Sequence, residues 1–344
     1  GKITLDKLKK GTYTIKEISA PYGYLLDNKS YNVEVKVNQT ATQAVVNIEP
    51  TGTFTLVKKN EDKSANLKGA EYRIWNDNYD KTFTTNDNGA IKVEGLKLGK
   101  YNYQETKAPE GYLLDDTVYS FELKYKDQNT AVVFASAERT DEEPTGSISI
   151  IKKDIKTGSV TQGDAVFEGA VYKVYAKEDI YNKAKTKKFY SNGDLVATRT
   201  MNEKGTTEDI TNLPLGKYVV KEEVAPKGYM IDTKEYDVTL SYKDQHEEII
   251  SNTTTSLEKV KEMGLHIFKS GIKENSGVTP GLAGAEFTIK LNADVEKAYK
   301  QGYTYEEVWN GIDEDGNQVT VNEKRVAEAQ KIAPTYEIIT TDEN

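Results

Sequence analysis

The stretch Lys-Tyr-Val-Val-Lys-Glu-Glu-Val-Ala-Pro-Lys-Gly-Tyr at residues 217–229 occurs in three versions along the chain. The earlier copies read Thr-Tyr-Thr-Ile-Lys-Glu-Ile-Ser-Ala-Pro-Tyr-Gly-Tyr at 12–24 and Lys-Tyr-Asn-Tyr-Gln-Glu-Thr-Lys-Ala-Pro-Glu-Gly-Tyr at 100–112. Side chains two residues apart in a β-strand lie on the same face. Glu17, Glu105 and Glu222 therefore share a face with the tyrosine and the second, mostly apolar residue of their strand. The pattern predicts, three times, a strand with a carboxylate on its core side.

The composition excludes several classes of function. The 344 residues, enough for two or three domains, carry 46 basic and 55 acidic side chains spread along the chain, which argues against a nucleic-acid partner. There are no cysteines and only two histidines, so we expect no disulfide, no metal site and no cofactor. No run of about 20 apolar residues is present, so the sequence predicts no membrane insertion.

Two further patterns repeat around the first one. Alternating runs that end in lysine stand at 53–58, 147–152 and 264–269, and a Gly-Ala-x-aromatic pattern ends at Tyr72, Tyr172 and Phe287. Turn signals such as Asn-Gly separate many short stretches rich in Thr, Val, Ile and Tyr. We therefore predict an all-β fold of tandem immunoglobulin-like or prealbumin-like β-sandwich modules.

Nearly identical Glu-Pro-Thr-Gly linkers at 49–52 and 143–146, and a polar stretch at 251–262 that we interpret as a connector, divide the chain. The predicted first unit, residues 1–51, is the C-terminal half of a module. The second, 52–144, is complete, and the third, 145–257, is complete with an insertion at 176–202. The fourth, 258–344, is the N-terminal part of a further module. We expect short helical insertions in the third and fourth units, with 292–309 and 322–332 helical in the fourth.

The opening runs also place a lysine on the core side of each strand: Lys58, Lys152 and Lys269. In the closing strands, Asn47 and Asn252 share a face with apolar residues. Burial lowers the pKa of a lysine and raises that of a glutamate. A neutral amine can then attack the amide carbon while the glutamate moves protons to the leaving ammonia. We expect an internal Lys–Asn isopeptide bond, formed once and within the chain, so the protein is not an enzyme in the usual sense.

These motifs together resemble Cna B-type domains, also called SpaA-like or prealbumin-like, which are repeat modules of Gram-positive cell-wall-anchored adhesins and pilins. The resemblance covers essentially the whole chain. It implies Lys–Asn or Lys–Asp isopeptide bonds promoted by a glutamate, an extracellular place at the cell surface or cell wall, and a role as a stalk. It assigns Lys152, Glu222 and Asn252 as the bond-forming triad of the third unit. Glu17 and Asn47 match the second half of a triad, and Lys269 the first half of another.

The second unit departs from this pattern. Aligning the sequence Tyr-Lys-Asp-Gln at 125–128 with its copy at 242–245 gives Ala135 as the equivalent of Asn252. The side chain of alanine has no carbonyl group that an amine could attack. Asp141 lies six residues later. We expect that the second unit, with Lys58 and Glu105 in place, either lacks the bond or uses Asp141.

The predicted function is a structural stalk of a surface protein, whose partners are the neighbouring repeat domains. An alternative is an adhesin module that binds host extracellular matrix or a glycan through the sandwich loops or the fourth unit's insertion. A further possibility is pairing of the terminal pieces between molecules, with Lys269 of one chain joined to Asn47 of another through Glu17.

Overall fold

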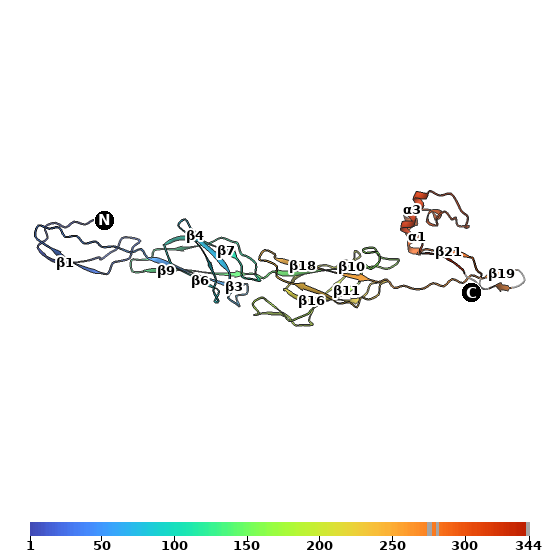
Figure 1. Cartoon of the computed structure of the whole chain (residues 1–344), viewed down its shortest axis with the longest axis horizontal. Helices are drawn as coiled ribbons and strands as arrows, with labels where there is room; N and C mark the ends of the chain where they lie inside the picture. Colours follow the sequence, from blue (N-terminus) through green and yellow to red (C-terminus); the bar gives the residue numbers. More distant parts are fainter. Residues whose placement is uncertain (274–276, 280–281, 342–344) are drawn as a thin grey trace.

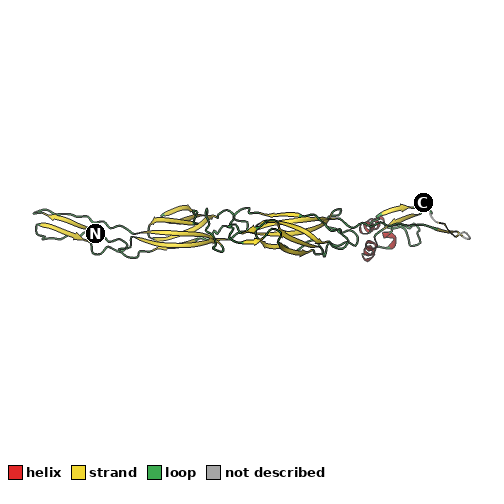
Figure 2. Ribbon diagram, turned by 90° about the horizontal axis from the view of Figure 1, so that it is seen from below, coloured by secondary structure: helices red, strands yellow, loops and turns green. Residues whose placement is uncertain are grey.

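The computed structural model describes residues 1–273, 277–279 and 282–341. It is an elongated molecule in which separate β-rich bodies follow one another along the long axis (Figures 1 and 2). Strands dominate, which confirms the predicted all-β class. No helix in the described residues is long and apolar enough to cross a membrane.

The second unit is a sandwich of two sheets. In the first sheet, β3 pairs with β6 antiparallel and with β9 parallel, and the second sheet has the order β5-β4-β7-β8. The first and last strands of the unit thus run side by side in the same direction. The strands are β3 (Thr51–Asn60), β4 (Glu71–Asn76), β5 (Tyr79–Thr84), β6 (Ala90–Leu96), β7 (Gly99–Lys107), β8 (Tyr119–Leu123) and β9 (Val132–Asp141).

Alternation along β3 explains how this sandwich forms. Phe54 and Leu56 point into the core and are fully buried, and they pack with Tyr72, Tyr101 and further apolar side chains of the facing sheet. Burying such side chains contributes roughly 1.5–3 kcal/mol each. The same alternation brings the next inward residue of β3, a lysine, to the end of the core.

The third unit repeats this topology. One sheet has the order β15-β10-β18, with β10 and β18 parallel, and the other has the order β14-β11-β16-β17. Its strands are β10 (Thr145–Asp154), β11 (Val171–Ala176), β14 (Leu195–Thr200), β15 (Ile210–Leu213), β16 (Gly216–Val224), β17 (Tyr236–Leu240) and β18 (Ile249–Glu258). The insertion between β11 and β14 holds a small hairpin, β12 (Ile180–Tyr181) and β13 (Lys188–Tyr190), so the helix predicted there was wrong. Its Ile180 is buried in the sandwich core, where strand pairing satisfies the backbone.

The terminal units are smaller. In residues 1–49, all of which the structure describes, no side chain is buried, and β1 (Gly11–Lys16) pairs only with β2 (Ser30–Val35). The fourth unit contains β19 (Gly271–Lys273) paired with β20 (Gly277–Thr279), and β21 (Glu286–Ile289) paired with β22 (Glu337–Thr340). The predicted helices of this unit are present as α1 (Asn292–Lys300), α2 (Tyr305–Val308) and α3 (Glu323–Ile332), packed around a small apolar core.

Candidate crosslinking sites

Two lysines lie at matching places in the second and third units. Lys58 near the end of β3 is 0% exposed, and Lys152 near the end of β10 is 1% exposed. Each lies on a first strand that runs parallel to the last strand of its unit. A buried ammonium is costly unless charged partners surround it. The side chains around each lysine therefore decide what the site can do.

In the second unit, Lys58 lies between two buried carboxylates. Its Nζ donates a hydrogen bond to Oδ1 of Asp141, lies 3.1 Å from Oε1 of Glu105, and is 2.9 Å from the hydroxyl of Tyr72. Asp141 is the last residue of β9, and Oδ2 of this carboxylate has no hydrogen-bond donor among the described residues. Of the two predicted outcomes for this unit, the structure brings together the residues of the Asp141 version.

The electrostatics of this site favour a protonated glutamate. Burial raises the pKa of Glu105 to about 8, although Lys58 acts against the rise, and the charge of Asp141 adds to it. Burial also raises the pKa of Asp141. Two carboxylates beside one ammonium leave an excess negative charge in a dry place, so one proton is retained near neutral pH. Glu105 is the group that holds it.

The third unit differs at one position. Lys152 Nζ lies 2.6 Å from Oε1 of Glu222 and 2.7 Å from Oε1 of Glu258, the last residue of β18. The same Glu258 oxygen accepts hydrogen bonds from Ser256 and, at 3.3 Å, from Tyr172. Burial raises the pKa of Glu222. Lys152 is thus enclosed by two glutamates and has no Asn or Asp as its closest partner.

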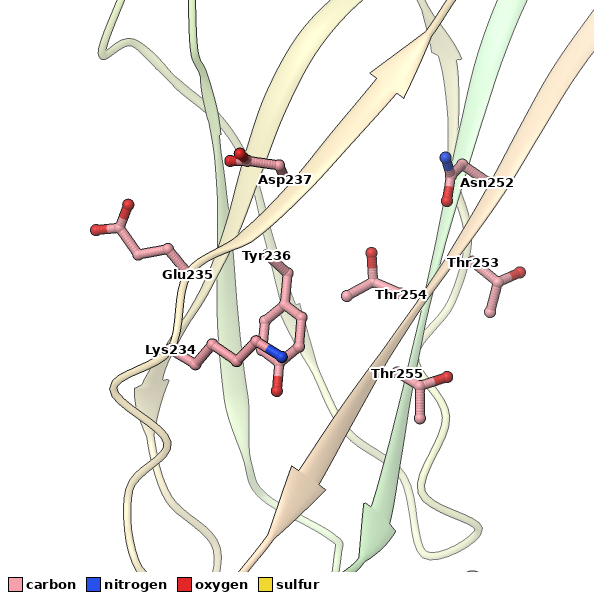
Figure 3. Close-up of a pocket in the computed structure, with 8 residues that line it drawn as sticks. All are labelled: Lys234, Glu235, Tyr236, Asp237, Asn252, Thr253, Thr254 and Thr255. Atoms are coloured by element: carbon pink, nitrogen blue, oxygen red, sulfur yellow. The ribbon is translucent and has the colours of Figure 1, made fainter.

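The predicted position of Asn252 beside Lys152 was wrong. In the parallel register Asn252 is opposite Ile148, whereas Lys152 is opposite Ser256, four residues further along β18. Four residues of strand span roughly 13 Å. The amide of Asn252 instead donates a 3.5 Å hydrogen bond to the carbonyl of Thr239, and its side chain lines a shallow pocket between β17 and β18 (Figure 3).

The reason for this error is the length of the closing strand. The polar stretch 251–262 reads as a connector, but β18 continues to Glu258 because its inward residues Thr254, Ser256 and Glu258 are all buried against the facing sheet. Glu258 lies two residues beyond the partner of Lys152, just as Asp141 lies two residues beyond Arg139, the partner of Lys58. Ala135 and Asn252 are equivalent, as the alignment predicted, since they lie opposite Phe54 and Ile148 on the first strands. Neither residue occupies the position beside the lysine, which belongs to Asp141 and Glu258.

The first unit holds a partial site. Nδ2 of Asn47 donates a 2.7 Å hydrogen bond to Oε2 of Glu17. The main chain indicates that Asn47 occupies the position that Asp141 and Glu258 occupy in the other units. In each unit the carbonyl of the next residue, which is Ile48, Glu142 or Lys259, accepts the backbone N–H of Leu25, Leu113 or Met230, respectively. Lys269, predicted on the core side of a strand, is exposed and lies outside the strands. A strand buries one face only when another sheet covers it, and no sheet covers 264–269 in the described residues.

A pair of successive hydrogen bonds supports each glutamate from behind, and the sequence analysis did not predict it. The backbone N–H of Asp27, Asp115 and Asp232 donates to Oε2 of the glutamate ten residues earlier, at 2.7, 3.1 and 2.6 Å. The hydroxyls of Tyr31, Tyr119 and Tyr236 donate in turn to these aspartates, at 2.5, 2.9 and 2.6 Å. The repeated Gly-Tyr-Leu-Leu-Asp, which becomes Gly-Tyr-Met-Ile-Asp in the third unit, is the signal that could have revealed it.

Fold and site together define a class: tandem prealbumin-like sandwiches whose first and last strands run parallel and enclose a lysine, a glutamate and a second carboxylate. The sequence model of the SpaA prealbumin-like fold domain matches residues 1–49, 52–138 and 146–255. These segments cover more than half of the chain, and the protein belongs to this family.

Three solved structures are reported as similar to this chain. The TIE protein of Bacillus anthracis is 28% identical with a TM-score of 0.50, and the match covers 73% of this chain and 42% of that one. The chain therefore spans less than half of that structure. The major pilin subunit BcpA of Bacillus cereus is 15% identical with a TM-score of 0.24, covering 61% of this chain and 100% of the pilin. A minor pilin of Streptococcus agalactiae is 17% identical with a TM-score of 0.26, covering 63% and 99%. A comparison with curated protein sequences gave no match.

Proposed function

We propose that this chain is a structural stalk segment of a pilin-like or adhesin-like protein at the bacterial cell surface or cell wall, and that an isopeptide bond between Lys58 and Asp141 locks its second unit. One observation carries the proposal. A buried lysine, a buried aspartate with an unbonded oxygen, and a glutamate of raised pKa lie in contact at the end of the first and last strands.

The chemistry follows from the contacts. A proton first passes from the ammonium of Lys58 to the carboxylate of Asp141 that it contacts, and the neutral amine then attacks Cγ of the protonated Asp141. Glu105 donates a hydrogen bond that polarises the carbonyl oxygen, takes a proton from the attacking nitrogen, and returns one to the leaving hydroxyl. A C–N bond forms, a C–O bond breaks, and one water leaves. Because burial keeps Glu105 protonated near neutral pH, the site holds an acid where the reaction needs one.

The bond would change how force passes through the unit. Load enters at Thr51 and leaves after Asp141, at opposite ends of two parallel strands. With the bond in place, it passes along β3 to Lys58 and directly to Asp141. Residues 59–140 then bear none of it, and the sandwich stays folded under tension. This is the behaviour that a stalk needs.

The third unit has a different balance of charges. Oε1 of Glu258 has three hydrogen-bond donors, Lys152, Ser256 and Tyr172, which hold this carboxylate in place beside the lysine. We therefore propose that Lys152, Glu222 and Glu258 form a buried ionic cluster without a covalent bond.

Intact-mass spectrometry of the whole chain tests the proposal. We expect the wild-type mass to be lower than the sequence mass by about 18 Da, the mass of one water, and the Glu105→Ala variant to show the full sequence mass. Asp141→Asn is the matched control, because its amide would lose about 17 Da as ammonia instead. A full-length mass for the folded wild type would exclude the crosslink.

A further inference from the structure

The sequence Tyr-Lys-Asp-Gln occurs at 125–128 and again at 242–245, and the crosslink chemistry uses neither copy. The copies occupy equivalent loops, between β8 and β9 in the second unit and between β17 and β18 in the third. In each loop the aspartate side chain accepts the backbone N–H two residues on, at 2.8 Å for Asp127 and 2.7 Å for Asp244. This local bond shapes the loop and fixes the neighbouring glutamine.

Each glutamine binds the preceding unit at two points. Oε1 of Gln128 accepts the N–H of Ala20 at 2.8 Å, and its main-chain oxygen accepts the N–H of Leu26 at 2.9 Å. Oε1 of Gln245 accepts the N–H of Ala108 at 2.9 Å, and its main-chain oxygen accepts the N–H of Leu114 at 3.0 Å. One residue thus joins both arms of the Ala-Pro-x-Gly-Tyr turn.

The tyrosine of the loop completes the contact. The hydroxyl of Tyr125 donates to the carbonyl of Tyr24 at 3.2 Å, and the hydroxyl of Tyr242 donates to that of Tyr112 at 3.4 Å. At the first joint, Tyr125 also packs edge-on against Tyr22, with ring centroids 4.9 Å apart. Three equivalent hydrogen bonds therefore recur at two joints, between residues that the sequence repeats.

From this recurrence we propose that the Tyr-Lys-Asp-Gln loop is a docking element, whose partner is the Ala-Pro-x-Gly-Tyr turn of the preceding prealbumin-like unit, and that the pair fixes the angle between successive units. Units joined by a short linker otherwise move relative to one another by default. Only three residues, 142–144, separate β9 from β10. The docked loop adds contacts away from this linker, so bending must break hydrogen bonds.

The hairpin of β12 and β13 reinforces the second joint. The N–H of Lys183 donates to both carboxylate oxygens of Glu143, at 2.9 Å each, and Thr186 lies 2.6 Å from Ser64 of the second unit, oxygen to oxygen. In the second unit the equivalent place is the tight turn between β4 and β5, so no hairpin reaches the first unit. We therefore expect the second joint to be the stiffer one.

Because the chain contains no cysteine, spin labels can be placed at introduced cysteines without background. Exposed strand positions near each joint suit this: Thr84 and Ser251 for the second joint, Lys16 and Ser120 for the first. Double electron–electron resonance then gives a distance distribution across each joint. We expect the wild-type distribution to be narrower across the second joint than across the first.

Variants of the glutamines separate the outcomes. We expect Gln245→Ala to widen the distribution across the second joint at least about twofold and to leave the first unchanged, with Gln128→Ala doing the reverse. Gln245→Glu, which keeps the acceptor oxygen, should stay narrow, and Glu143→Ala should widen the second joint alone. Unchanged widths in both alanine variants would overturn the proposal. Intact mass reads the crosslink independently, so either proposal can fail without the other.

Discussion

At the residue scale, the second carboxylate of the two buried lysine sites differs in length. It is Asp141 in the second unit and Glu258, which is longer by one methylene group, in the third. Asp141 and Glu258 occupy the same register position, two residues beyond the partner of the lysine. Each of these carboxylates has one oxygen without a donor among the described residues, Oδ2 of Asp141 and Oε2 of Glu258. The difference lies at the oxygen beside the lysine: Oε1 of Glu258 also accepts from Ser256 and Tyr172, whereas Oδ1 of Asp141 accepts from Lys58. On the proposed chemistry, the same backbone would support a reactive pair in one unit and a stable ionic cluster in the next.

Shortening Glu258 should convert the third site. We expect the Glu258→Asp variant to form a bond with Lys152, because Glu222 already stands where Glu105 does and the strand register is the same. Its intact mass should lie two waters, about 36 Da, below its own sequence mass, whereas the wild type lies one water below its own. Combining the change with Glu222→Ala is the control, and the mass of that double variant should lie a single water below its own sequence mass. A Glu258→Asp mass equal to that expected for a single water loss would show that the acceptor residue alone does not decide reactivity.

The raised pKa of Glu222 makes the third unit sensitive to pH. A carboxyl whose pKa is higher in the folded state binds its proton more tightly there, so its contribution to stability is complete below its ordinary pKa of about 4.3 and is lost as pH rises through the folded value. We expect the Glu222→Gln variant to lose less stability than the wild type between acid and neutral pH. Hydrogen exchange of β10 and β16 peptides across this range measures the difference. Parallel pH profiles would contradict the prediction.

At the element scale, the Glu-Pro-Thr-Gly linkers acquire a structural role. Each glycine lies one residue inside the first strand of a unit, and a Cβ at that place would collide with a buried leucine of the facing sheet, Leu123 for Gly52 and Leu240 for Gly146. The glycine therefore lets β8 and β17 pack close to the first strand. The repeated linker marks the beginning of the sandwich core.

A methyl group at Gly52 should be destabilising. We expect Gly52→Ala to cost about 1–3 kcal/mol, because Leu123 must leave its position in a close-packed core. Urea unfolding in the Glu105→Ala background, where no crosslink interferes, measures the cost. Gly69→Ala is unsuitable as a control because Gly69 has a φ of +93°, so Thr82→Ala on the exposed face of β5 serves instead. Equal stability of the Gly52 and Thr82 variants would refute the collision.

At the scale of the whole molecule, the units follow one another along the long axis (Figures 1 and 2). The two proposed devices act at different places along this axis. The proposed bond protects the interior of the second unit from tension. The docked loops set the angles between the units. Together they would give a stalk that resists both stretching and bending, without any disulfide.

Stretching single molecules should show which units extend. We expect the wild-type second unit to give no unfolding step, and the Glu105→Ala variant to gain a step on the order of 300 Å, the contour length of the residues between Lys58 and Asp141. The third unit, with no proposed bond, should unfold in both proteins and serves as the internal control. An identical number of steps in the two proteins would contradict the mechanical role.

The sequence by itself determined the sandwich class, the inward lysines Lys58 and Lys152 and the glutamates facing them, because strand alternation is a local property with a period of two residues. It did not determine which residue meets each lysine. That depends on the register between strands more than 80 residues apart and on how far a polar closing strand continues, which only the facing sheet decides. Tertiary structure therefore places Glu258 instead of Asn252 beside Lys152, brings Asp141 into contact with Lys58, and places each Tyr-Lys-Asp-Gln loop on the turn of the unit before it.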